Sequence, residues 1–300
     1  MHRLLVPTSE LSSDAPQLSK EAANHLKVLR PKDGEEIELF DGKGKWRVFL
    51  FRRDKSVASP LVSRGRGTPA SPQSEDLHLQ PPPPSLILFA CVTKGSRWDW
   101  TIEKATELGV TRIVPVISDR TIVRVDAKER EAKRERWTRI AEDAARQSDA
   151  KWIPEVLAPV TFAESLALVR ETQCFVGALT MPPPRTIGAV LGSLVPHICR
   201  GEAELPKAVA RAVCVLARGD GELLPAAAED GSRYGFSLYV GPEGDFTPEE
   251  LSALLEIATP VSFGTTILRA ETAAIYGISA IKTFLDTRLA TTDSRESVGN

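Results

Sequence analysis

Two stretches near the carboxyl end of this chain decide its fold: LYVGPEGDFTPEEL, residues 238–251, and VSFGTTILRAETAAIYGISAI, residues 261–281. Each begins with a short apolar run, passes into a turn that contains glycine, and continues into a predicted helix. Glycine after a buried strand suits a backbone that turns sharply or approaches a ligand closely. In open α/β sheets, ligands bind outside the carboxyl ends of the strands. We therefore expect the two turns, at the ends of adjacent strands, to form the walls of one pocket.

Taken alone, the two turns are also compatible with ordinary strand-to-helix connections that bind nothing. Their sequences, GPEGDF at residues 241–246 and LRAETAA at residues 268–274, resemble the RsmE family. That family methylates N3 of uridine in 16S, small-subunit, ribosomal RNA and belongs to the SPOUT class of methyltransferases. The resemblance implies an α/β trefoil-knot domain that binds S-adenosylmethionine (SAM) and works as a homodimer.

The chain has 300 residues, 42% of them hydrophobic and 26% charged, which is typical of a soluble protein of about two domains. Its net charge is −2, so any surface for nucleic acid must be a local patch. The apolar stretch within residues 1–13 is too short for a signal peptide, and no apolar run approaches the length of a membrane span. We expect a cytoplasmic protein, organellar if the cell is eukaryotic, with no membrane partner.

The four cysteines, Cys91, Cys174, Cys199 and Cys214, include no CxxC pair. A zinc site is therefore not expected, and the sequence indicates no other metal site. Cys91 and Cys174 lie inside apolar runs, where cysteine behaves as a small buried hydrophobic residue. We predict two buried free thiols there, a pattern that fits a reducing compartment.

Residues 1–58 are predicted to form a small β-rich domain, similar to a barrel. Residues 21–30 indicate a short helix. Two strands are expected at residues 35–40 and 46–51, because charged and apolar residues alternate in the first and a glycine-containing hairpin signal separates it from the second. Short strands joined by tight turns favour this fold class over a helical one.

The order of NHLKVLR, residues 24–30, and ELFDGKG, residues 38–44, resembles the PUA-like RNA-binding domain that precedes the RsmE catalytic domain. By that resemblance, His25 and Arg30 are candidate RNA contacts. The alternative is a surface pair that contacts only the local backbone.

Residues 59–84 are rich in Ser, Gly, Arg and Pro and end in four prolines, residues 81–84. Such a composition cannot bury enough apolar surface to offset the entropy lost on ordering. Consecutive prolines favour an extended, semi-rigid spacer. We therefore expect a linker with a loop insertion between the two domains.

Residues 85–288 are expected to form the α/β domain. The apolar runs at residues 86–92 and 112–118 are typical of buried parallel strands. The segment between them predicts a helix with one apolar face, made by Trp98, Ile102 and Ala105. A strand, a helix and a second strand in this order indicate a parallel sheet.

The stretch KGSRWDWTIEKATELGVTRIVPVISDR, residues 94–120, is the longest part of the chain that resembles the RsmE catalytic domain. Lys94 and Arg97 follow a predicted strand and begin a helix, which makes them candidate RNA-phosphate contacts. The alternative is a pair of solvent-facing charges at a helix entrance. Ser96 and Asp99 have the spacing of a capping box at that helix start.

Residues 126–147 alternate acidic and basic side chains and predict an exposed helix with many ion pairs. Gln147 and Ser148 resemble the next family motif, whereas Ala150 stands where the family pattern has Arg. If that arginine contacts RNA or a partner subunit in the family, this chain has lost or relocated the contact.

A strand is predicted at residues 174–180, followed by an insertion at residues 185–235 that we expect to be partly disordered. The final helix should run from residue 271 to about residue 286, with an apolar stripe on one side. Residues 289–300 are polar, and we expect them to form a disordered tail.

The resemblance places the functional residues on the two turns and on the strand at residues 174–180. Arg269 would act by fixed positive charge on the uracil, and Glu271 would be either the base or a charge that complements the helix dipole. The residues that would hold SAM are Leu179, Gly241, Pro242, Glu243, Gly244, Gly264, Ile267, Leu268 and Thr272.

Three other functions are compatible with parts of this sequence. The chain could be a SPOUT methyltransferase with another RNA target, or an RNA-binding module with reduced activity. A Rossmann-type nucleotide enzyme is disfavoured because no GxGxxG motif follows a predicted strand.

Overall fold

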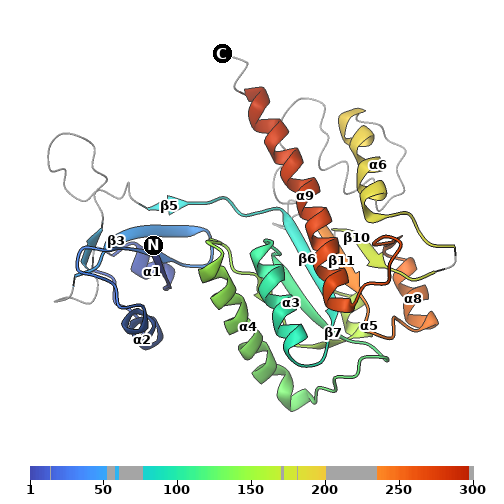
Figure 1. Ribbon diagram of the computed structural model, residues 1–300, viewed down its shortest axis with the longest axis horizontal. Coiled ribbons are helices and arrows are strands. Elements are labelled where there is room, and N and C mark those ends of the chain that lie inside the picture. Colours follow the sequence, from blue (N-terminus) through green and yellow to red (C-terminus); the bar gives the residue numbers. More distant parts are fainter. Residues whose placement is uncertain are drawn as a thin grey trace. The chain divides into compact units, whose positions relative to one another are not determined.

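The computed structural model describes residues 1–13, 15–52, 58–60, 77–169, 172–180, 182–200 and 235–296; residues 58–60, 172, 195–200 and 288–296 are described by their backbone alone. The chain forms two compact units, one of residues 1–83 with 142–153 and the other of residues 84–141 with 154–300 (Figure 1). Cys214 and the basic residues Arg53 and Lys55 lie outside the described residues.

The first unit is built on a five-stranded sheet in which β1 and β2 are parallel, β2 and β3 are antiparallel, and β4 and β5 both pair with β3. Its strands are β1 (His2–Leu5), β2 (Glu36–Phe40), β3 (Lys45–Leu50), β4 (Ala58–Pro60) and β5 (His78–Leu79). The predicted hairpin between the second and third strands is confirmed. Strands β4 and β5 lie at the two ends of the stretch that we expected to be a linker.

Two helices, α1 (Thr8–Leu11) and α2 (Lys20–Leu29), accompany this sheet. Helix α2 begins where the Ser19 side chain accepts a hydrogen bond from the backbone N–H of Ala22. It ends at Arg30, whose φ of 48° is left-handed. The predicted helix is therefore confirmed, and its buried residue Leu26 joins an apolar core with Leu4, Ile37, Leu39 and Phe49.

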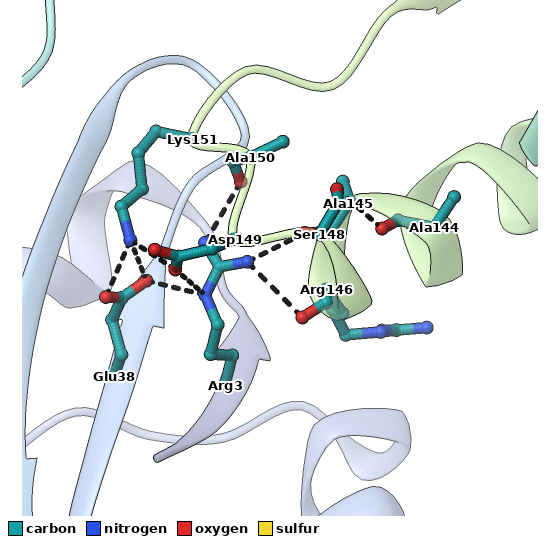
Figure 2. A network of polar contacts seen from close by, with 9 residues as sticks. All are labelled: Arg3, Glu38, Ala144, Ala145, Arg146, Ser148, Asp149, Ala150 and Lys151. Carbon is teal, nitrogen blue, oxygen red and sulfur yellow. Dashed lines mark hydrogen bonds and ion pairs between the residues drawn. The ribbon is translucent and has the colours of Figure 1, made fainter. Parts of the chain in front are cut away.

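A buried network of charges joins β1 and β2 to residues 145–151, which also belong to the first unit (Figure 2). The Arg3 guanidinium donates to Glu38 Oε1 (2.8 Å) and to the carbonyls of Ala145 (2.7 Å) and Ala150 (3.0 Å). The Lys151 ammonium donates to both oxygens of the same glutamate, at 2.7 Å each. Glu38 can therefore be buried in a strand although it is charged.

The second unit contains a parallel sheet with the strand order β12–β10–β11–β6–β7–β8, and β9 also pairs with β7. Its strands are β6 (Ser85–Cys91), β7 (Arg112–Ile117), β8 (Glu155–Val156), β9 (Val160–Thr161), β10 (Thr172–Gly177), β11 (Gly235–Val240) and β12 (Thr259–Val261). The prediction that β11 and β12 are adjacent is wrong, because β10 lies between them and pairs with both.

The described helices of this chain beyond residue 84 are α3 (Ser96–Glu107), the short 3₁₀ helix η2 (Ala127–Glu129), α4 (Arg130–Gln147), α5 (Phe162–Leu166), α6 (Ile187–Arg200), α8 (Pro248–Leu255) and α9 (Ala270–Glu296). Helix α9 lies against α3, α6, β6 and β11. Its predicted apolar stripe is buried, as is the predicted apolar face of α3; the stripe consists of Ala274, Ile278, Ile281 and Leu285. No helix of the described residues is long and apolar enough to cross a membrane.

Three local predictions need correction. The capping box at Ser96 and Asp99 is wrong: the residue before α3 is Gly95, with φ 69° and no side-chain cap, and Asp99 instead pairs with Arg136. The final helix continues to Glu296 and does not end at about residue 286, so the disordered tail expected at residues 289–300 is wrong for residues 289–296, which continue the helix. The expected insertion at residues 185–235 begins with helix α6, and its residues 201–234 lie outside the described residues.

Candidate functional site

Three loops that carry predicted cofactor residues leave the sheet of the second unit at the same edge. Strand β10 is parallel to both of its neighbours, β11 and β12, so the carboxyl ends of the three strands point the same way. Leu179 follows β10, residues 241–244 follow β11, and residues 264–268 follow β12. The two turns therefore flank the β10 loop at one edge of the sheet, which is the position where open α/β sheets bind ligands.

The turn after β11 has a backbone that most side chains would not permit. The N–H of Asp245 donates to the carbonyl of Pro242 (2.9 Å), and Asp245 has a left-handed φ of 59°. A Cβ at Gly241 would lie 3.2 Å from both the Asp245 carboxylate and the Phe246 ring. Glycine at position 241 therefore allows the turn to pack closely against the buried ring of Phe246.

Two arginines hold this turn. Arg120, in the loop after β7, donates through Nη1 to the carbonyls of Gly244 (2.8 Å) and Phe246 (3.1 Å). Arg97, in the first turn of α3, lies 3.4 Å from a carboxylate oxygen of Glu243. The same Arg97 side chain lies 3.9 Å from Glu271 at the start of α9. The structure thus brings Arg97, a predicted RNA contact, together with two predicted site carboxylates.

Glu271 presents an unpaired oxygen to a small hollow between β6, β11, α3 and α9. Its Oε2 is buried and has no hydrogen-bond partner, and the same is true of Thr93 Oγ1 and Trp98 Nε1. All three residues line the hollow, together with Ala90 and Val240. Buried polar atoms are rarely left unpaired in proteins, but this hollow has no room for a water molecule, so these atoms could gain a partner only if the side chains around them moved.

Two predicted site residues close to Glu271 in the sequence are open to solvent. Arg269 and Thr272 are exposed, and within the described part of the chain the Arg269 guanidinium has no hydrogen-bond or ion-pair partner. An arginine side chain keeps its positive charge at any relevant pH. Arg269 is therefore a free cation beside the three loops.

The residues at the three strand ends fit the chemistry of SAM. Leu179 and Ile267 are 65% and 81% exposed although they are apolar, so a flat apolar ring such as adenine would bury surface that water now covers. Gly264 has φ 118°, and apart from its chain neighbours no atom lies within 4 Å of the place that a Cβ would take. The backbone N–H and C=O groups at Gly264 are therefore accessible to the polar edge of a ligand such as adenine.

The predicted RNA contacts divide between the two units. His25 is half-buried in α2, and Arg30 is exposed at the end of that helix. In the second unit, Lys94 is exposed beside Arg97 and has no polar partner among the described residues. No cluster of His, Cys, Asp or Glu in the described chain could hold a metal ion.

Sequence analysis missed two residues that bind the site loops, Arg120 and Glu250. Glu250 closes a capping box with Thr247, and its Oε1 also accepts from the backbone N–H of Asp119 (2.9 Å). The spacing of Thr247 and Glu250 is itself a capping-box signal that could have been found in the sequence. Nothing local in the sequence indicates that either side chain reaches another loop.

Comparison with known proteins identifies two matching family models. An RNA methyltransferase domain matches residues 80–181 and 203–282, and an RNA methyltransferase PUA domain matches residues 18–50. The Synechocystis protein named ribosomal RNA small subunit methyltransferase E is 28% identical, over 95% of this chain and 78% of its own length. The Bacillus subtilis protein of the same name is 28% identical, over 91% of this chain and 93% of its own length.

Solved structures show a similar fold. The ribosomal RNA small subunit methyltransferase E of Neisseria gonorrhoeae, bound to SAM, is 26% identical with a TM-score of 0.63. That similarity covers 94% of this chain and 97% of the Neisseria chain. A methyltransferase of Legionella pneumophila in complex with SAM has a TM-score of 0.64 at 24% identity, which supports the fold.

Proposed function

Because the chain belongs to the RNA methyltransferase family, we propose that it transfers a methyl group from SAM to N3 of a uridine in 16S, small-subunit, ribosomal RNA. The observation that carries this proposal is the set of three loops at one edge of a parallel sheet, with two glycine-bearing turns and exposed apolar side chains. The names of the relatives in Synechocystis and Bacillus subtilis support the ribosomal RNA target. Such a substrate is available in the cytoplasm, or in an organelle that has its own ribosomes.

The three loops would hold SAM with different parts of the chain. Leu179, Ile267 and Leu268 would contact the adenine, and Glu243 would accept hydrogen bonds from the ribose hydroxyls. Bound there, SAM supplies an electrophilic methyl group. The other proposed contacts are backbone groups of glycine and proline residues and one residue at the start of α9. They are Gly241, Pro242, Gly244, Gly264 and Thr272.

Arg269 is proposed to act on the base. N3 of uridine carries a proton, so it is a poor nucleophile until that proton leaves, and the departing proton leaves negative charge on the neighbouring carbonyl oxygens. A fixed cation positioned at such an oxygen stabilises that charge without reorganising. Arg269 is exposed and free of described partners, so it can approach the base.

Glu271 has two candidate roles. As an acidic residue in the first turn of α9, it complements the positive end of the helix dipole. Its buried and unpaired Oε2 is also an acceptor that could take the N3 proton if the side chain turns toward the base. Replacement by Gln removes both the negative charge and the proton acceptor: the dipole role predicts lower stability with methyl transfer retained, and the base role predicts loss of methyl transfer.

The target nucleotide must be unpaired or flipped out, because N3 is used in a Watson–Crick pair. We propose that phosphates next to that nucleotide contact Lys94 and Arg97 in the second unit, and that the PUA-like first unit contributes His25 and Arg30. Phosphate contacts position an RNA without reading its bases, so these residues should affect RNA affinity more than target choice.

The test is methyl transfer by the purified protein with labelled SAM and small ribosomal subunits from a strain that lacks its own copy. Digestion to nucleosides and mass spectrometry would identify the product, and N3-methyluridine is the expected one. Another methylated nucleoside would indicate a SPOUT enzyme with a different target. RNA binding without any transfer would indicate a binding module.

We also propose that the protein is a homodimer in which α9 contributes to the interface. Tyr276, on α9, is 48% exposed although it is large and aromatic, which suits a surface that a second subunit covers. Sedimentation at micromolar concentration should give twice the mass of 32.7 kDa for one chain. A stable monomer under the conditions in which the enzyme is active would contradict this proposal.

A further inference from the structure

Two segments of the second unit are joined by reciprocal side-chain contacts. One is the loop after β7, and the other is the turn after β11 with the start of α8. Arg120, from the loop after β7, donates to the carbonyls of Gly244 (2.8 Å) and Phe246 (3.1 Å). In return Glu250, from the first turn of α8, accepts from the backbone N–H of Asp119 (2.9 Å). We call these contacts the two-way clamp.

On each side of the clamp, a further hydrogen bond between a side chain and a backbone N–H constrains the segment that carries the clamp residue. The second oxygen of Glu250 accepts from the N–H of Thr247 (3.0 Å), so both carboxylate oxygens have backbone donors, and the residue is only 6% exposed. On the other side, the buried Thr121 hydroxyl accepts from the N–H of Ser118 (3.0 Å), which constrains the loop that carries Arg120. Hydrogen bonds to a charged side chain are stronger than neutral ones, and a buried one leaves little freedom to its partners.

The clamp connects strands that are not neighbours. Strand β6 lies between β7 and β11, so the β7 loop reaches past the end of β6 to the turn that follows β11. That turn, residues 241–246, carries four of the proposed SAM contacts. Its conformation therefore depends on a loop that supplies none of them.

We propose that Arg120 and Glu250 are positioning residues, which hold residues 241–246 in the conformation that binds SAM before SAM arrives. This inference rests on the proposed function for the identity of the ligand. A preformed site binds more tightly because less ordering is required when the ligand enters. Loss of the clamp should therefore weaken cofactor binding, even though neither side chain touches the cofactor.

The test compares substitutions in the whole 300-residue chain, with S-adenosylhomocysteine, the demethylated product of SAM, as the probe in calorimetry. Arg120→Met removes one side of the clamp, and Glu250→Gln leaves one acceptor oxygen for two backbone N–H donors, which weakens the other side. Arg112→Met is the matched control for the first, because Arg112 lies at the other end of β7 and pairs with Glu155. Glu164→Gln is the control for the second, because Glu164 closes the capping box of α5 with Thr161.

Both clamp variants should bind the probe about 10- to 100-fold more weakly than wild type, and both controls within about twofold. Affinities are measured at a temperature at which circular dichroism shows each variant folded. The combined variant Arg120→Met/Glu250→Gln should bind S-adenosylhomocysteine only slightly more weakly than the single variant that has the lower affinity. The two losses should not add, since both changes release the same turn. Arg120→Lys keeps the charge and one donor, so its affinity should lie between those of wild type and Arg120→Met.

Equal affinity of wild type and the clamp variants would overturn the inference, and so would an equal loss in the controls. Failure of the wild-type protein to bind the probe at all would instead contradict the proposed cofactor. The two failures are therefore distinguishable, because the first leaves wild-type binding intact.

Discussion

At the scale of single residues, Arg269 carries the charge on which the proposed chemistry depends. It lies in the loop that enters α9, and in the described chain no acidic side chain neutralises it. We predict that Arg269→Ala slows methyl transfer by at least about 100-fold, since that is the usual cost of removing one donor to a developing oxyanion. Affinity for S-adenosylhomocysteine should change by less than about threefold, because the residue acts on the base.

Steady-state kinetics with saturating RNA and calorimetry with S-adenosylhomocysteine would separate the two effects of Arg269→Ala. Arg269→Lys is the control, because it keeps the charge but loses the planar fork of donors. Its rate should lie between those of the wild type and the alanine variant. A loss of cofactor affinity as large as the loss of rate would show that Arg269 holds SAM rather than the base.

The thiols of Cys91 and Cys174 are the second residue-scale feature. Both are buried and free, as predicted. Burial raises the pKa of each thiol from 9.0 to about 12, although nearby hydroxyls, such as that of Ser118 beside Cys91, partly oppose the rise. Only a thiolate reacts readily with alkylating reagents, so both residues should be inert in the folded protein.

The pH dependence of alkylation follows from the direction of these shifts. A thiol in the unfolded chain ionises near pH 9, whereas the two buried thiols remain protonated until about pH 12. We predict no iodoacetamide adduct on Cys91 or Cys174 at pH 8.5 without denaturant, and full labelling of both in urea, measured by peptide mass spectrometry. Because the unfolded state loses these protons first, the thiols should lower folding stability as pH rises above 9. Rapid labelling in native buffer would contradict their burial.

At the scale of elements, close packing of α9 depends on Gly277. A Cβ there would lie 2.5 Å from Leu238 Cδ2, on β11, and 3.1 Å from the Phe263 ring. Leu238 is fully buried and has little space to move. We predict that Gly277→Ala lowers the free energy of unfolding by roughly 0.5–2 kcal/mol, because overpacking at about 1–3 kcal/mol exceeds the gain in helix propensity.

Gly192→Ala, in α6, is the matched control. Gly192 is also a helical glycine, but among the described residues, and apart from its chain neighbours and the nearby backbone of its own helix, no atom lies within 4 Å of the place that its Cβ would take. This substitution should raise the free energy of unfolding by about 0.5–1 kcal/mol, because alanine loses less entropy in a helix. Urea denaturation of the two variants should therefore shift the midpoint in opposite directions. Stabilisation by Gly277→Ala would mean that the contact of α9 with β11 can relax.

The elements that could be predicted from sequence are those with a strong local pattern. The apolar runs at residues 86–92 and 112–118 became the buried strands β6 and β7, because a parallel strand covered on both faces is apolar throughout. Strand order has no such local signal, so the position of β10 between β11 and β12 could not be inferred from the turns. The two turns lie at one edge of the sheet, as expected, whereas the contacts of Arg120 and Glu250 with other loops span long sequence distances and have no local signal in the sequence.

At the scale of the whole chain, residues 142–153 belong to the first unit although almost sixty residues of the second unit precede them. The contacts responsible join residues that are 113 positions apart, Glu38 and Lys151, and 142 positions apart, Arg3 and Ala145. Figure 2 shows Arg3 between Glu38 and the carboxyl end of α4, where its guanidinium faces backbone carbonyls that have no partner inside a helix. The sequence of residues 142–153 alone, or of β1 and β2 alone, could not show that these segments pack together.

Glu38 is the centre of that network, so its neutralisation should be costly. We predict that Glu38→Gln lowers the free energy of unfolding by up to about 3–5 kcal/mol, because Arg3 and Lys151 then share only the carboxylate of Asp149, whose side chain is 73% exposed. Glu155→Gln is the control: its pair with Arg112 is exposed, and such pairs contribute at most about 1 kcal/mol. Urea denaturation followed by circular dichroism measures both.

A second substitution distinguishes loss of a charge partner from loss of packing. If the cost of Glu38→Gln arises from a buried ammonium that keeps only the exposed carboxylate of Asp149, removing that ammonium with Lys151→Met should restore part of the stability, since a buried ion pair can be replaced by apolar groups with little loss. The methionine would place apolar atoms over the Trp46 ring, where the Lys151 ammonium now lies 4.7 Å from the ring centroid. Additive losses in the double variant would show instead that the two residues stabilise the first unit through separate contacts.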